Sequence, residues 1–182
     1  KAYRVNAENG EMTYIGEIEN IEIEGSKALS CEPYAIELDD GTILAHIRVQ
    51  CYPIKVFTLY QSKSTDGGRT WSTPRQILAR EGGAPAHILQ HSSGLLVCTY
   101  GYRGEPLRTP PFGIKVMFSQ DNGETWSKSE DIYVNEVSLD LGYPSTVELK
   151  DGSLLTVFYA HLAPDEPAVI LQQKWRLKND EI

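Results

Sequence analysis

Hydrophobic residues fall into short runs rich in branched and aromatic side chains, and Gly-containing turns separate these runs. Three segments share one pattern: PYAIEL, AHILQH and STVELK are each followed by a turn and a second apolar run. The turns are Asp40-Gly41, Ser93-Gly94 and Asp151-Gly152. A two-residue turn whose Gly can take a positive φ, set between two β-rich runs, is typical of a hairpin. No long stretch keeps helical periodicity, so the sequence predicts an all-β protein.

The hairpins belong to a longer repeat with a fixed order. A third apolar run follows each hairpin, as KVFTLYQS, IKVMFS and VILQQKW, and in the first two repeats a polar turn leads on to TPRQIL and DIYV. Four antiparallel strands in a unit of about 50 residues are the anatomy of a β-propeller blade. We predict one propeller segment with about three blades: residues 1–25 end a preceding blade, 26–80 and 81–136 are blades, and 137–182 form an incomplete last blade.

The polar turn occurs twice with one pattern, Ser-x-Asp-x-Gly-x-Thr-Trp, at Ser64–Trp71 and Ser119–Trp126. In such a turn Asp accepts hydrogen bonds from the following amides, and Gly takes the left-handed conformation. A calcium loop needs more oxygen ligands at alternate positions, and a phosphate loop needs a Lys and a helix after its glycines. We therefore expect the two turns to be scaffolding.

Composition narrows the class of protein. The net charge of −8 disfavours nucleic acid and anionic membranes as partners, although a few local arginines suffice for a small anion. No apolar run reaches the roughly 20 residues of a membrane span, and the start of the chain lacks the apolar core of a signal peptide, so we expect a soluble protein of unassigned compartment. Cys31, Cys51 and Cys98 form neither a disulfide framework nor a zinc pattern and are expected to be buried as small hydrophobes.

The spacing of the histidines does not predict a metal site. His87 and His91 lie on an expected strand, where four residues span roughly 13 Å, too far for one zinc ion. His46 and His161 fall at equivalent strand positions and are expected in a pocket or in the core. We predict neither a metal nor another cofactor.

The repeated turn resembles the Asp box of sialidase (neuraminidase) and BNR-repeat propellers, where the box lies at the outer hairpin of each blade, away from the catalytic cleft. The segment RVNAENGEMTYIGEIEN resembles a degenerate Asp box followed by the outer strand of an earlier blade. Sialidase propellers have six blades, so the resemblance implies that this chain is the C-terminal half of such a ring. The edges of its outer blades would then need a missing N-terminal half, a second chain or a twofold copy to cover them.

Three residues precede the aligned prolines at the starts of the inner strands: Glu32, Ala84 and Tyr143. In a propeller these starts reach the rim of the central funnel. Repeat symmetry places the three residues at one height and radius, so Glu32 and Tyr143 flank a small Ala and can point into one pocket.

The same resemblance implies roles for these residues. Sialidases use a Tyr nucleophile that a Glu activates, because the sugar carboxylate repels an anionic nucleophile. The resemblance thus assigns Tyr143 as nucleophile and Glu32 as base, although the family Tyr is usually followed by Ser and here by Pro144. The alternatives are a solvated Glu32 and a Tyr143 that only packs.

Sialidases also bind the substrate carboxylate with three arginines, whose planar guanidinium groups pair with it. By resemblance Arg48 fits the second arginine, and Arg103 or Arg108 fits the third. A structural ion pair is the alternative role of Arg48. The first arginine and the acid/base Asp belong to blades that are not in this sequence.

The sequence therefore predicts a sialidase-like, retaining exo-glycosidase that acts on a terminal anionic sugar such as sialic acid, with a glycan as its partner. The alternative is a non-catalytic BNR-repeat propeller that binds glycan or protein. The distance between the Tyr143 hydroxyl and the Glu32 carboxylate separates the two, because proton transfer needs hydrogen-bond reach.

Overall fold

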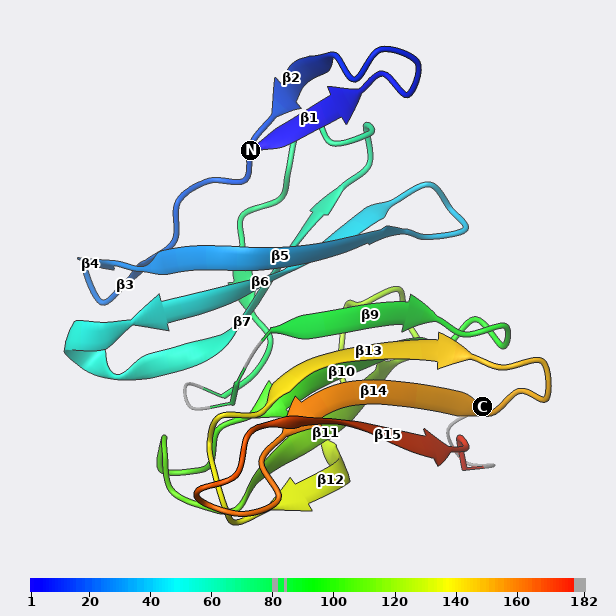
Figure 1. The fold of residues 1–182 in the computed structure, drawn as a ribbon. Helices are drawn as coiled ribbons and strands as arrows, with labels where there is room; N and C mark the ends of the chain where they lie inside the picture. Colours follow the sequence, from blue (N-terminus) through cyan, green and yellow to red (C-terminus); the bar gives the residue numbers. More distant parts are fainter. Residues whose placement is uncertain (80–81, 84, 179–182) are drawn as a thin grey trace.

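The computed structural model describes residues 1–79, 82–83 and 85–178, and within them it contains five antiparallel sheets (Figure 1). The elements are β1 (Ala2–Val5), β2 (Met12–Gly16), β3 (Glu22–Ile23), β4 (Ser26–Lys27), β5 (Leu29–Glu37), β6 (Ile43–Cys51), a 3-10 turn η1 (Tyr52–Ile54), β7 (Val56–Ser64), β8 (Arg75–Gln76), β9 (Ala86–Gln90), β10 (Leu96–Tyr102), β11 (Phe112–Ser119), β12 (Glu130–Asn135), β13 (Gly142–Glu148), β14 (Leu154–Ala160) and β15 (Val169–Trp175). No helix in the described part of the chain is long and apolar enough to cross a membrane.

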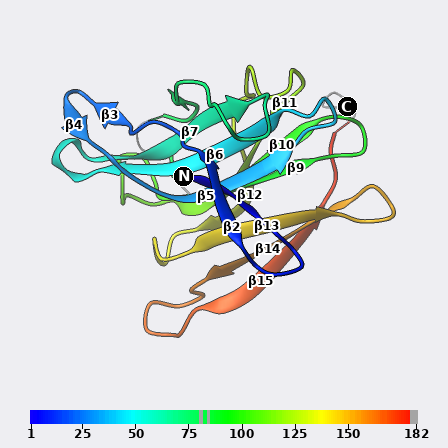
Figure 2. The ribbon, with the colours of Figure 1, turned by 90° about the horizontal axis from the view of Figure 1, so that it is seen from above.

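The three main sheets repeat one topology. The strand orders are β5-β6-β7-β8, β9-β10-β11-β12 and β13-β14-β15, and each strand pairs with its neighbour in sequence. The first strands β5, β9 and β13 lie next to one another, and Figure 2 shows the sheet of β13–β15 to one side of the strands β5–β7. This arrangement confirms the predicted all-β fold of propeller blades.

The core lies between neighbouring sheets, where the apolar side chains of one sheet pack against those of the next. Two groups fill the space between the first and second sheets, and two more fill the space between the second and third. Their buried members include Leu44, Leu59, Ile88, Leu96, Cys98, Tyr100, Val97, Ile114, Leu154 and Phe158. Each such side chain contributes about 1.5–3 kcal/mol on burial, so the stacking of sheets is the main source of stability.

Cysteine burial departs from the sequence prediction at one position. Cys51 and Cys98 are buried as expected, but Cys31 is only half-buried, and all three are free thiols. The β5–β6 register shifts between Cys31 and Tyr34, and this irregularity interrupts the regular alternation of side chains next to Cys31.

The two Ser-x-Asp-x-Gly-x-Thr-Trp turns share one set of hydrogen bonds. Asp66 accepts from the Thr70 amide and hydroxyl, at 2.9 and 2.6 Å, and Asp121 accepts from the same groups of Thr125 at 2.8 and 2.6 Å. These bonds hold the pKa of both carboxyls well below the usual range. Gly123 takes the expected positive φ of 79°. The contacts are local and match the scaffolding prediction.

The tryptophan of the second turn joins two sheets. Trp126 Nε1 donates to Gln61 Oε1 at 2.9 Å, and the same oxygen lies 3.2 Å from His46 Nε2. The other ring nitrogen of His46 lies 3.4 Å from Cys98 Sγ. Because Gln61 Oε1 accepts only, His46 carries its proton on Nε2, and burial lowers its pKa to about 4. His46 is therefore a neutral core residue, not a pocket residue.

The hairpin β1–β2 packs against the first of these turns. A Cβ at Gly16 would lie 2.3 Å from the carbonyl oxygen of Arg69, so only glycine permits this approach. The hairpin leaves Tyr3, Met12 and Tyr14 exposed on its other side.

Candidate functional site

Glu32 and Tyr143 meet at the rim, although 111 positions separate them along the chain. The Tyr143 hydroxyl donates to Glu32 Oε1 at 2.6 Å. Glu32 lies in β5 and Tyr143 in β13, so two different sheets supply the pair. The residue between them in the repeat symmetry, Ala84, lies outside the described residues.

The backbone is strained at both members of the pair. Glu32 has φ 47° and Tyr143 has φ 51°, and a non-glycine residue in this region costs about 1–3 kcal/mol. In both strands the pairing register shifts at this point, next to Pro33 and Pro144. A shift of this kind turns a side chain out of the regular alternation of the strand, and here it turns the carboxylate and the phenol toward each other.

Arg48, in β6, forms the third member of this group. Its Nη1 donates to Glu32 Oε2 at 2.7 Å, and its guanidinium lies 4.9 Å from the ring centre of Phe57. With its amide oriented to satisfy both neighbours, Gln50 accepts from Arg48 Nε at 2.9 Å and donates to the Tyr52 hydroxyl at 2.8 Å. The structural ion pair considered for Arg48 is therefore present, and it fixes the Glu32 carboxylate.

Neighbouring charges set the protonation of the pair. Burial raises the pKa of Glu32, but the hydrogen bonds from Tyr143 and Arg48 outweigh it and leave the pKa below its ordinary value. The hydrogen bond to Glu32, with burial added, raises the pKa of the Tyr143 hydroxyl. The resting pair is thus a neutral phenol that donates to a carboxylate, the arrangement from which the carboxylate can take the proton.

A pocket of about 520 Å³ lies beside this group. All three arginines predicted for a ligand, Arg48, Arg103 and Arg108, line it, and so does Lys55. Asp140 is the one carboxylate in its wall among the described residues. The remaining lining residues are Gln50, Cys51, Tyr52, Val56, Phe57, Leu107 and Leu139. An excess of positive charge in a concave site favours an anionic ligand.

Loop geometry places two of these cations. Arg108 has φ 70°, and its amide donates to the carbonyl of Arg103 at 2.9 Å, which closes the loop between β10 and β11. Lys55 has φ 52° at the end of η1. Both Arg103 and Arg108 line the pocket, so its geometry favours neither of them as the third arginine.

Sequence reasoning missed a second group at the rim. The Tyr159 hydroxyl donates to Asp140 Oδ1 at 2.6 Å, and His161 Nε2 lies 3.1 Å from Asp140 Oδ2. Tyr159 pairs across the sheet with Gly142, the neighbour of Tyr143. The Asp three residues before Tyr143 was the available signal, because Asp140 must lie near the same rim.

A second hollow of about 290 Å³ lies on the other side of the pair. Its wall includes Glu32, Tyr143, Tyr34 and His87, with Pro33, Pro85, Ala86, Pro144 and Ser145. Burial lowers the pKa of His87, whose ring packs against Tyr34 in a tilted arrangement with the centroids 4.5 Å apart. Within residues 1–79, 82–83 and 85–178, no three His, Cys, Asp or Glu side chains cluster as metal ligands do.

Solved structures resemble this fold over nearly its whole length. A protein of unknown function from Dyadobacter fermentans is 20% identical with a TM-score of 0.71, covering 97% of this chain and 45% of that one. A Penicillium chrysogenum alpha-L-arabinanase, complexed with arabinobiose, is 16% identical with a TM-score of 0.71, covering 94% of this chain and 53% of that one. A Hadza microbial sialidase is 16% identical with a TM-score of 0.62, covering 92% and 37%.

At these identities the likeness shows the fold alone. The chain spans about half the length of the first two structures and less of the sialidase. A family model described as a BNR repeat-like domain matches residues 4–157, which include both motif turns, Glu32 and Tyr143. By this match the chain belongs to the BNR repeat-like domain family.

Proposed function

We propose that this chain carries the nucleophile and base of a retaining, sialidase-like exo-glycosidase that acts on terminal anionic sugars such as sialic acid. The observation that carries the proposal is the 2.6 Å hydrogen bond from the Tyr143 hydroxyl to Glu32 beside a pocket lined by cations. The acid that protonates the leaving group, and one further arginine, would come from blades outside this sequence.

The first step forms a glycosyl–tyrosine bond. Tyr143 Oη attacks the anomeric carbon while its proton passes to Glu32 Oε1, and the glycosidic bond breaks as the leaving oxygen takes a proton from the external acid. In the second step the external acid, now deprotonated, takes a proton from water as the water oxygen attacks the same carbon. The Tyr143 oxygen leaves and recovers its proton from Glu32. Two inversions at one carbon retain its configuration.

A neutral nucleophile suits an anionic sugar. The carboxylate on the anomeric carbon of the sugar would repel the negative charge of an attacking Asp or Glu side chain. The phenol of a Tyr carries no charge and is not repelled. Glu32 accepts the proton only as the bond forms, and Arg48 holds it in place for that transfer. Arg103, Arg108 and Lys55 then bind the sugar carboxylate from the pocket wall.

A neutral sugar is the competing substrate class, because the Penicillium enzyme is complexed with arabinobiose. Four cationic side chains against one carboxylate in the pocket favour an anion instead. A non-catalytic glycan-binding propeller is the other alternative. The direct contact between phenol and carboxylate, each on a strained backbone, favours catalysis over binding alone.

The test is hydrolysis of a fluorogenic sialoside by the full-length protein and its Tyr143→Phe variant. Loss of the nucleophile is expected to lower kcat by at least about a thousandfold while free sialic acid still binds. Tyr14→Phe is the matched control, because Tyr14 is 51% exposed and Tyr143 50%, but Tyr14 lies in the hairpin β1–β2. Activity that survives Tyr143→Phe rules out the nucleophile, and turnover of an arabinoside in place of the sialoside rules out the substrate class.

A further inference from the structure

His161 holds an arrangement that requires two protons on its ring. Nδ1 lies 2.7 Å from the backbone carbonyl of Glu166, and Nε2 lies 3.1 Å from the Asp140 carboxylate. Both partners are acceptors only, so each ring nitrogen must donate. The buried Asn135 fixes the backbone, because its Nδ2 donates to the His161 carbonyl at 2.9 Å. A neutral imidazole satisfies only one of the two acceptors, and the observed geometry is therefore that of an imidazolium.

Asp140 links this cation to the pocket. Its carboxylate accepts from Tyr159 and faces His161, and the guanidinium of Arg103 lies near enough to stabilise its charge. These groups lower the pKa of Asp140, with the Tyr159 hydrogen bond contributing most. Asp140 and Arg103 both line the pocket, whereas His161 lies behind Asp140.

The start of β13 fixes where Arg103 lies. A Cβ at Gly142 would lie 3.4 Å from Arg103 Nη2, so the guanidinium rests over this glycine, which has φ 135°. Burial and the hydrogen bond to Asp140 raise the pKa of the Tyr159 hydroxyl, and the nearby Arg103 guanidinium opposes this shift in part. Arg103 is thus located between Asp140 and the Tyr143 strand, on the side from which it reaches a ligand in the pocket.

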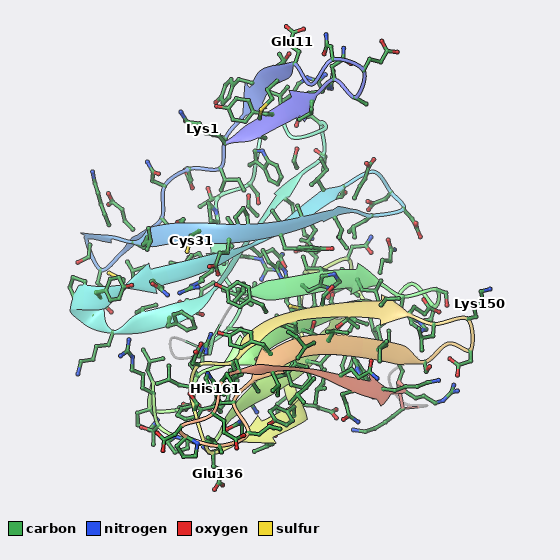
Figure 3. All side chains as sticks on the ribbon, in the orientation of Figure 1. Lys1, Glu11, Cys31, Glu136, Lys150 and His161 are labelled. Atoms are coloured by element: carbon green, nitrogen blue, oxygen red, sulfur yellow. The ribbon has the colours of Figure 1, made fainter. Side chains whose placement is uncertain are left out.

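We propose that protonated His161 is a positioning residue, which acts through Asp140 to hold Arg103 in the pocket, so that loss of the imidazole proton weakens binding of an anionic sugar. The inference rests on the proposed function, because it concerns the ligand of the same pocket. Figure 3 shows His161 at the same end of the sheets as Cys31 and Lys150 at the opposite end. Cys31 directly precedes Glu32 in the sequence.

The sign of the pH effect follows from the groups that face His161. These are the Asp140 carboxylate, the Tyr159 hydroxyl and the Arg103 guanidinium beyond them, with the Glu166 carbonyl on its own loop. The Glu166 carbonyl and Asp140 raise the pKa of His161 above its ordinary value. His161 therefore carries its charge below this raised pKa and loses it as the pH rises through it. Affinity for an anion falls in the same direction.

The experiment measures the Kd of free N-acetylneuraminic acid for the full-length protein by calorimetry, from about pH 5.5 to 8.5. In the wild type we expect Kd to rise about threefold to tenfold over this range, because the charge that acts on Arg103 through Asp140 is lost. His161→Gln is always neutral and His161→Lys always charged. For His161→Gln we expect weak binding with a Kd that changes little with pH. For His161→Lys we expect tight binding with a Kd that also changes little with pH.

His91→Gln is the control, because His91 also faces a carboxylate, Glu148, but lies past the far end of β9. It should keep the wild-type profile. If His161→Gln binds with the pH dependence of the wild type, the inference is wrong and the proposed function stands. If the wild type fails to bind N-acetylneuraminic acid at any pH in the range, the proposed function is wrong and the inference with it.

Discussion

Two tyrosine–carboxylate pairs lie side by side at the rim, and they are alike in chemistry. Tyr143 donates to Glu32 and Tyr159 donates to Asp140, each over 2.6 Å. The two rings are 6.0 Å apart. In both pairs the pKa of the phenol is raised and that of the carboxyl is lowered. Protonation alone therefore does not distinguish a catalytic pair from a supporting one.

The pairs differ in how the backbone presents them. Tyr143 and Glu32 come from different sheets, and both lie at positive φ. Tyr159 lies in the regular part of β14, and Asp140 lies in the loop that leads into the same sheet. Backbone strain at both members of the first pair, which lie in different sheets, indicates a functional constraint. The second pair forms without such strain. We infer that the first pair reacts and the second supports the pocket.

The largest difference between the two pairs is expected in kcat when their carboxylates are replaced by amides. Glu32→Gln removes the proton acceptor of Tyr143 and is expected to lower kcat about 10²–10⁴-fold. Asp140→Asn keeps the shape of the second pair and should change kcat less than about tenfold, with the main effect on KM. Steady-state hydrolysis of a sialoside by the full-length variants measures both. Equal losses of kcat in the two variants would mean that the pairs do not have separate roles.

Tyr159→Phe is expected to have the smallest effect. It removes the hydroxyl that donates to Asp140 but keeps the ring that packs near Tyr143, so Arg103 loses one of the contacts around it. We expect KM to rise about twofold to fivefold and kcat to stay nearly constant, as for a lost interaction that serves binding only. The same assay measures it, and a fall in kcat as large as that of Tyr143→Phe would contradict the assignment.

The contact between Glu32 and Tyr143 follows from the repeat. Because the same hairpin recurs, the residues before its prolines must occupy equivalent places on neighbouring sheets, and this argument needs no knowledge of loops. The strand order of each sheet and the hydrogen bonds of the motif turns follow from local patterns in the same way.

The rest of the site depends on segments that do not repeat. Asp140 lies in a connection between sheets, and Arg108 lies in a loop of the second repeat, so no symmetry argument locates either. His161 was expected in a pocket or in the core, but its partners are a carbonyl and a carboxylate that only the folded loops bring together. His46, at the equivalent strand position, is instead enclosed by the second sheet.

The most direct test of the catalytic assignment is to trap the glycosyl–enzyme bond. A sialosyl fluoride with a second fluorine beside the anomeric carbon reacts with the nucleophile but releases it slowly, because the fluorine destabilises the positive charge that develops in both steps. Mass spectrometry of the treated full-length protein should find one added sugar on the peptide that contains Tyr143, and none in the Tyr143→Phe variant. A sugar on a different residue, or turnover of the sialoside with no trapped adduct, would contradict the account.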